Sequence, residues 1–124
     1  MKKLVFIFLA SLVSMAVRAQ LNNTKWKGTI HSDNDIDVVF NYRSDTLEVT
    51  NTSDNSNVET MTYTAKDNVL TLKKIYGQSN CDVTGTGKYK FEVKNDLLYI
   101  TLISDSCEDR TSALSNSKWI KTGN

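Results

Sequence analysis

The two cysteines are the residues whose type and spacing most clearly predict chemistry. Cys81 lies 14 residues before Asn95 and Cys107 lies 12 residues after it, so a hairpin that turns at Asn95 brings them nearly opposite each other. A disulfide is then geometrically feasible, because bridged Cα atoms lie roughly 4.4–6.8 Å apart. Two free thiols and half of a metal site are the alternatives, but four-ligand zinc usually takes close Cys pairs and histidines, and this chain has one His. We expect a disulfide, which would stabilise the fold by roughly 3–4 kcal/mol in the chain-entropy treatment.

A second cluster of residues that could do chemistry lies in the first third of the chain. Its members, one histidine and three aspartates, share one short turn: His31, Asp33, Asp35 and Asp37. The alternating acids are similar to the start of a calcium loop, but Val38 stands where an EF-hand needs glycine and Ser44 where it needs a bidentate glutamate. Asp, Asn and Ser are also ordinary turn residues. No metal site and no cofactor are therefore expected.

No catalytic constellation stands out. His31 has no evident nucleophile partner, the chain lacks a Gly-x-Ser-x-Gly motif, and both cysteines are expected to be oxidised. A catalytic carboxylate pair cannot be recognised among fourteen acidic residues. We expect a non-catalytic protein, with an enzyme as the remaining alternative.

The first 19 residues have the pattern of a signal peptide. Lys2 and Lys3 precede an apolar run over residues 4–17, and Val17-Arg18-Ala19 is a small-residue cleavage site. A transmembrane anchor is the alternative, but the run is shorter than the ~20 residues that a spanning helix needs. We expect cleavage of residues 1–19, no integral membrane segment afterwards, and an exported protein, periplasmic or secreted, in an oxidising compartment that suits a disulfide.

Residues 20–124 are expected to form one domain. Without Lys2, Lys3 and Arg18 the chain has 12 basic and 14 acidic residues, a net charge of −2. This charge gives no electrostatic case for binding nucleic acid or an anionic membrane surface. There is no proline, and the composition suits short strands joined by polar turns.

Apolar residues alternate with polar ones along most of the mature chain, which predicts strands with one buried face. The expected inward set carries almost no charge and consists of Trp26, Ile30, Val38, Phe40, Leu47, Val49, Met61, Tyr63, Leu70, Leu72, Tyr89, Phe91, Val93, Leu98, Ile100 and Leu102. The connections are polar and mostly short, as antiparallel neighbours require. We therefore predict an all-β fold, a small antiparallel up-and-down β-barrel of about eight strands, with a two-sheet sandwich as the alternative.

The last third of the chain contains the clearest hairpin. Alternation up to Val93 is followed by a polar break over residues 94–96 and a second alternating run. Residues 108–116 lose this period, and we expect a short helical turn there with Asp105 or Ser106 as its N-cap. Residues 117–121 are the expected eighth strand.

These features resemble a known superfamily. An early Trp26-Lys27-Gly28, a run of hairpins and a late Arg110 are similar to the calycin superfamily, specifically to bacterial lipocalin-like domains. The order Trp26-x-Gly28 resembles the fatty-acid-binding branch more than the lipocalins proper. The resemblance implies that Trp26 closes one end of the barrel and that Arg110 packs across it and bonds to nearby main chain, with Trp119 as a further structural residue. A core Trp26 with a solvent-facing Arg110 is the alternative.

The sequence leaves the function open between two classes. An eight-stranded barrel is filled by its side chains or holds one small ligand. Our first hypothesis is a carrier for a hydrophobic small molecule, whose expected ligand-binding residues are Phe40, Met61, Tyr63, Tyr89, Phe91 and Ile100. The alternative is a filled β-barrel acting as a protein-binding module, a periplasmic inhibitor or an envelope-associated partner, with no partner that the sequence identifies.

Overall fold

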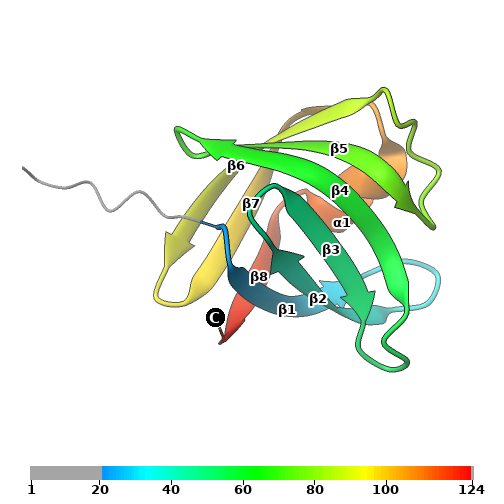
Figure 1. Ribbon diagram of the computed structural model, residues 1–124, viewed down its shortest axis with the longest axis horizontal. Coiled ribbons are helices and arrows are strands. Elements are labelled where there is room, and N and C mark those ends of the chain that lie inside the picture. The colour runs from blue at the N-terminus through cyan, green and yellow to red at the C-terminus, as the bar shows by residue number, and fades with distance from the viewer. Residues whose placement is uncertain (1–20, 124) are drawn as a thin grey trace, which may run out of the picture.

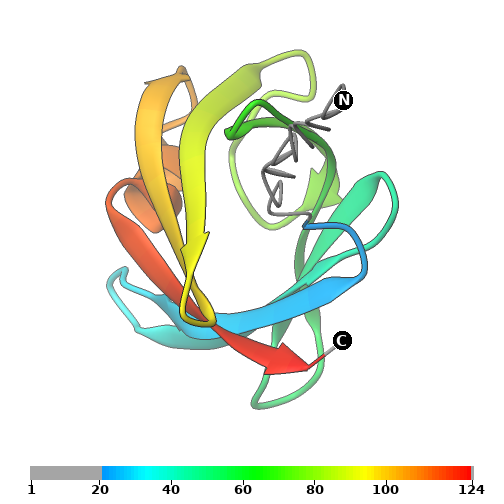
Figure 2. The same cartoon turned by 90° about the vertical axis from the view of Figure 1, so that its left-hand side faces the viewer.

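The protein is an antiparallel β-barrel of eight strands closed by pairing between its first and last strands. A computed structural model describes residues 21–123. In chain order the elements are β1 (Thr24–Ile30), β2 (Ile36–Tyr42), β3 (Thr46–Asn51), β4 (Asn57–Lys66), β5 (Val69–Gly77), β6 (Thr86–Lys94), β7 (Leu97–Asp105), α1 (Glu108–Leu114) and β8 (Ser117–Gly123). Each strand pairs with the next, and Figure 2 shows β8 completing the ring beside β1. The predicted all-β barrel is confirmed.

Tight turns of Asn and Asp set the hairpin registers. Asn95 and Asp96 have φ of 53° and 60°, and Asp67 and Asn68 have φ of 53° and 62°. Two consecutive left-handed residues give the turn whose twist matches paired strands, and Asn and Asp tolerate that conformation better than most residues. The hairpin predicted around Asn95 is confirmed, with Lys94 opposite Leu97 and Phe91 opposite Ile100.

Buried aromatic side chains pack against one another in the barrel interior. Phe40 stacks on Trp119 with ring centroids 4.0 Å apart, and the Trp119 ring lies against Gly28, where a Cβ would come within 2.3 Å of it. Tyr42 and Tyr63 meet edge to face at 5.1 Å. Trp26 is also buried, and its indole N–H donates to the Thr24 hydroxyl at 2.8 Å. These aromatic contacts leave little free space in this part of the barrel.

One member of the expected inward set does not reach the interior. Leu102 is 42% exposed, and Ile103 beside it is 52% exposed. The pairing of β6 with β7 shifts here, from Lys88 opposite Ser104 to Tyr89 opposite Leu102, so Ile103 is an extra residue in β7. This bulge ends the regular alternation that predicted burial of Leu102, because a bulge re-aims the side chains around it.

The short helix α1 lies between β7 and β8 and packs on β7 (Figure 1). Its N-cap is Cys107, which makes no side-chain capping bond, so the expected cap at Asp105 or Ser106 is wrong. The Asp105 carboxylate accepts hydrogen bonds from the Cys107 N–H and from Arg110 instead. The predicted disulfide is confirmed: Cys81 and Cys107 are bridged with Cα atoms 5.2 Å apart, which ties the β5–β6 loop to the start of α1.

Candidate ligand pocket

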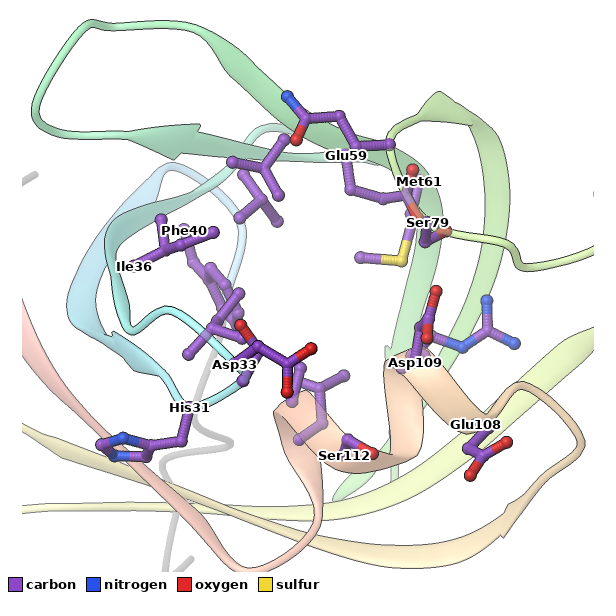
Figure 3. A pocket seen from close by; sticks show the side chains of 18 residues that line it. His31, Asp33, Ile36, Phe40, Glu59, Met61, Ser79, Glu108, Asp109 and Ser112 are labelled. Atoms are coloured by element: carbon purple, nitrogen blue, oxygen red, sulfur yellow. Dashed lines mark hydrogen bonds between the residues drawn. The ribbon is translucent and has the colours of Figure 1, made fainter.

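A cavity of about 660 Å³ opens at the end of the barrel beside α1 (Figure 3). Seven parts of the chain form it: the end of β1, the β1–β2 loop, β2, β3, β4, the β5–β6 loop and α1. Its volume falls within the range of roughly 300–1,000 Å³ that small-molecule sites occupy. The hollow is therefore large enough for one small organic ligand.

The cavity has an apolar interior and an acidic margin. The apolar lining residues are Ile30, Ile36, Phe40, Val49, Val58, Met61, Ala113 and Leu114. The ionisable ones are His31, Asp33, Glu59, Glu108, Asp109 and Arg110. Figure 3 shows Asp33 reaching into the space from the β1–β2 loop, opposite Asp109 of α1, while His31 and Glu108 point outward. An apolar hollow with a few polar groups is the usual chemistry of a ligand site.

Glu59 is the acidic residue most deeply set in the cavity wall. It is 7% exposed and its Oε2 accepts a hydrogen bond from the Ser79 hydroxyl. Its Oε1 has no hydrogen-bond partner, and its nearest cation is the Lys74 ammonium at 3.8 Å. Lys74 itself donates to the Ser79 carbonyl at 2.6 Å. Glu59 therefore corrects the expectation that the inward face carries almost no charge.

Glu59 fits its site because the adjacent residue of β5, Gly77, has no side chain. A Cβ at Gly77 would lie 1.8 Å from Glu59 Oε1 and 2.6 Å from its Cα, so only glycine leaves room for the carboxylate. Gly77 also has a φ of 149°, a conformation that residues with a side chain rarely adopt. The end of β5 is thus shaped around a buried acid.

A buried ion pair holds α1 against the barrel beside this cavity. Arg110 donates from Nε to Asp105 Oδ2 at 2.6 Å and from Nη2 to Asp105 Oδ1 at 2.8 Å. The Tyr89 hydroxyl donates to the same carboxylate. The two charged side chains are 3% and 0% exposed. A Cβ at Gly87 would come within 2.3 Å of Asp105 Oδ2 and 2.8 Å of Arg110 Nε, so the network also depends on a glycine.

The titration of this network follows from its contacts. Burial by itself would raise the pKa of Asp105, but the bonds from Arg110, Tyr89 and the Cys107 N–H outweigh it and hold that pKa below its usual value. Burial opposes the charge on Arg110 too, yet the Asp105 carboxylate raises the pKa of the guanidinium. Burial and the adjacent Asp105 together raise the pKa of Tyr89. All three effects keep Asp105 and Arg110 ionised and Tyr89 protonated at neutral pH.

The expected ligand-binding residues separate into two groups. Phe40 and Met61 line the cavity. The other four, Tyr63, Tyr89, Phe91 and Ile100, are buried but do not line it. Tyr63 donates its hydroxyl to the Arg43 carbonyl, and Tyr89 donates to Asp105. Period-two alternation identifies buried positions but does not say at which end of the barrel the space lies.

Arg110 makes a different contact from the one that the family resemblance implied. It is buried as a structural residue, but its partner is the Asp105 carboxylate rather than main chain. Within residues 21–123 the aromatic contacts include no cation–π pair between Arg110 and Trp26. The alternative of a solvent-facing Arg110 is also wrong.

The acidic side chains of the turn after β1 do not converge on one point. His31 Nδ1 lies 3.3 Å from Asp35, and Asp37 accepts a hydrogen bond from Thr29 at 2.6 Å, both at exposed positions. Asp33 faces the cavity. In residues 21–123 no three His, Cys, Asp or Glu side chains come together as a metal-binding group would.

The fold and the cavity define a class, a small closed β-barrel with an open-ended pocket, apolar inside and acidic at its margin, next to a disulfide-anchored helix. Comparison with protein-family models, with curated proteins and with solved structures finds no match to this chain. Across residues 21–123 no helix is long and apolar enough to cross a membrane. The predicted signal peptide, residues 1–19, lies outside the described residues.

Proposed function

We propose that this protein is a non-catalytic, exported, lipocalin-like barrel that binds one small molecule with an apolar body. The observation that carries the proposal is the cavity of about 660 Å³, whose wall includes eight apolar residues from five different elements. The Cys81–Cys107 bridge supports export to an oxidising compartment, periplasmic or extracellular, because such bonds persist there.

The position of the cavity supports binding rather than core filling. The Phe40 ring stacks on Trp119 and forms part of the cavity wall, while the end beside α1 stays hollow. The Asp105–Arg110 pair and the disulfide both fix α1, which forms one wall. A wall held at two points gives a preformed site, and preformed sites bind without a large ordering cost.

Native mass spectrometry of the mature protein purified from its own host tests this proposal. Extra mass that disappears on denaturation is the expected result. Added 1-decanol should also bind, and Ala113→Phe, which places a ring in the cavity, should weaken it, whereas Thr101→Phe on the exposed side of β7 should not. A bare chain that also ignores decanol would overturn the proposal and favour a filled barrel that binds another protein.

A further inference from the structure

The charged residues that line the cavity indicate which charge a bound ligand with an apolar body should carry. Four carboxylates line it, those of Asp33, Glu59, Glu108 and Asp109, against the single guanidinium of Arg110. The charge of Arg110 is matched by Asp105, which accepts hydrogen bonds from Nε and Nη2 at 2.6 and 2.8 Å, whereas Nη1 has no hydrogen-bond partner. Lys74, which does not line the cavity, offsets only Glu59. Since Glu108 points outward, Asp33 and Asp109 are the two carboxylates that face the site without a cation of their own.

His31 does not change this balance. It lies against Asp35 at 3.3 Å on the exposed β1–β2 loop, and it points away from the cavity in Figure 3. Its partner Asp35 is outside the lining. The potential inside an apolar hollow of low polarity follows the nearest charges, and these are negative.

Glu59 supplies a specific recognition group within this field. Its side chain is nine-tenths buried in the cavity wall, yet its Oε1 accepts no hydrogen bond. The Lys74 ammonium stays 3.8 Å away because it donates to the Ser79 carbonyl. A buried carboxylate oxygen without a donor is costly, and a ligand N–H group would relieve that cost. Figure 3 shows Glu59 and Ser79 on the same side of the space as Asp109, with the Met61 thioether between the apolar and polar parts.

We propose that the pocket selects an organic cation: an amphiphile whose apolar body lies among Phe40, Val49 and Met61 and whose protonated amine goes to Glu59 and the acidic margin. This inference rests on the proposed small-molecule function and adds the ligand's charge to it. A fatty-acid-like anion is disfavoured, since its carboxylate would approach the acids while the charge of the lining guanidinium is paired with Asp105.

Three probes with the same ten-carbon chain test the charge directly: decylamine, 1-decanol and decanoate. Each is titrated by calorimetry at neutral pH, the two ionic probes below their micelle concentrations and decanol below its solubility limit. Decylamine should bind roughly tenfold or more tightly than decanol, the size of one hydrogen bond to a charged group, and decanoate should bind most weakly. Added salt should weaken decylamine binding and leave decanol unchanged.

Variants locate the effect. Glu59→Gln should remove most of the preference for decylamine over decanol, and Asp33→Asn, at an exposed position that is safe for folding, should remove part of it. Glu48→Gln, an acid on β3 outside the cavity, should have no effect on either ligand. If Glu59→Gln does not fold, the Asp33→Asn result and the three-probe order still decide the question.

The outcomes separate the two proposals. If none of the three probes binds, the small-molecule function itself is wrong. If decanol and decanoate bind as well as decylamine, or better, the pocket function stands and the cation selectivity is overturned. Equal loss of decylamine and decanol binding in Glu59→Gln would also overturn it, since that pattern means a damaged pocket rather than a lost charge contact.

Discussion

Replacing Asp105 by asparagine should be among the most destabilising single changes in this barrel. The change keeps the shape of the side chain but removes its charge, which leaves the Arg110 guanidinium buried, 3% exposed, without a counter-ion. Breaking a buried ion pair by removing one partner costs about 3–5 kcal/mol. Small domains unfold with a total of about 5–15 kcal/mol, so this loss is a large fraction of the stability.

Urea unfolding followed by tryptophan fluorescence measures the effect. The matched control is Glu48→Gln, which breaks the exposed pair between Arg43 and Glu48, 58% and 35% exposed. Exposed pairs contribute about 0.2–1 kcal/mol, so the control should lose less than about 1 kcal/mol. A double variant, Asp105→Leu with Arg110→Met, should recover part of the stability, because it removes the uncompensated charge as well as the pair.

A loss in Asp105→Asn no larger than that of the control would refute this reasoning. It would mean that the Arg110 charge finds water or another partner when Asp105 is lost, and that the pair does not fix α1. A double variant less stable than Asp105→Asn alone would instead show that Arg110 stabilises the fold independently of Asp105.

Three further predictions concern the same end of the barrel. Gly87→Ala should cost about 1–3 kcal/mol, because its Cβ would lie 2.3 Å from Asp105 Oδ2, whereas Gly85→Ala, with no contact closer than 3.4 Å, should be nearly neutral; equal melting temperatures would contradict the crowding. Reduction of the Cys81–Cys107 bond should add the mass of two hydrogens and lower stability by roughly 3–4 kcal/mol, and an unchanged mass would exclude the disulfide. The pKa of Asp105 is lowered in the folded state from 3.8, so the contribution of its carboxylate to fold stability is complete above that value and is lost as the pH falls through the folded pKa. The urea midpoint of the wild type should therefore drop in this acidic range more than that of Asp105→Asn. Parallel curves of urea midpoint against pH for the two proteins would contradict the pairing.

The barrel itself could be predicted because short stretches of sequence determine its strands and its turns. Alternation with a period of two marks each strand, and the Asn95 turn fixes the register of the last hairpin. The disulfide followed from that register. The bulge at Ile103 could not be anticipated, because one extra residue leaves the sequence pattern intact while it turns Leu102 outward.

The pocket was harder to predict, although one signal was present. Glu59 lies in phase with Met61 and Tyr63 on the buried face of β4, so alternation alone marks it as an inward charge. For Asp105 the sequence signal is misleading, because an aspartate just before a short helix is typical of an N-cap. Only the three-dimensional approach of Arg110 and Tyr89 shows that its carboxylate belongs to a buried network. Loops and a seven-residue helix form much of the cavity, and neither carries a periodic pattern.

The proposed function requires that the hollow beside α1 is a binding site. The most direct test is a titration of ¹⁵N-labelled mature protein with 1-decanol, followed by backbone amide chemical shifts. We expect the shifts to change at residues 30–36, 58–61 and 109–114, which surround the cavity, and to stay constant around Tyr63 and Phe91. No saturable shift, or changes centred on the exposed Tyr76 and Ile103, would contradict the account.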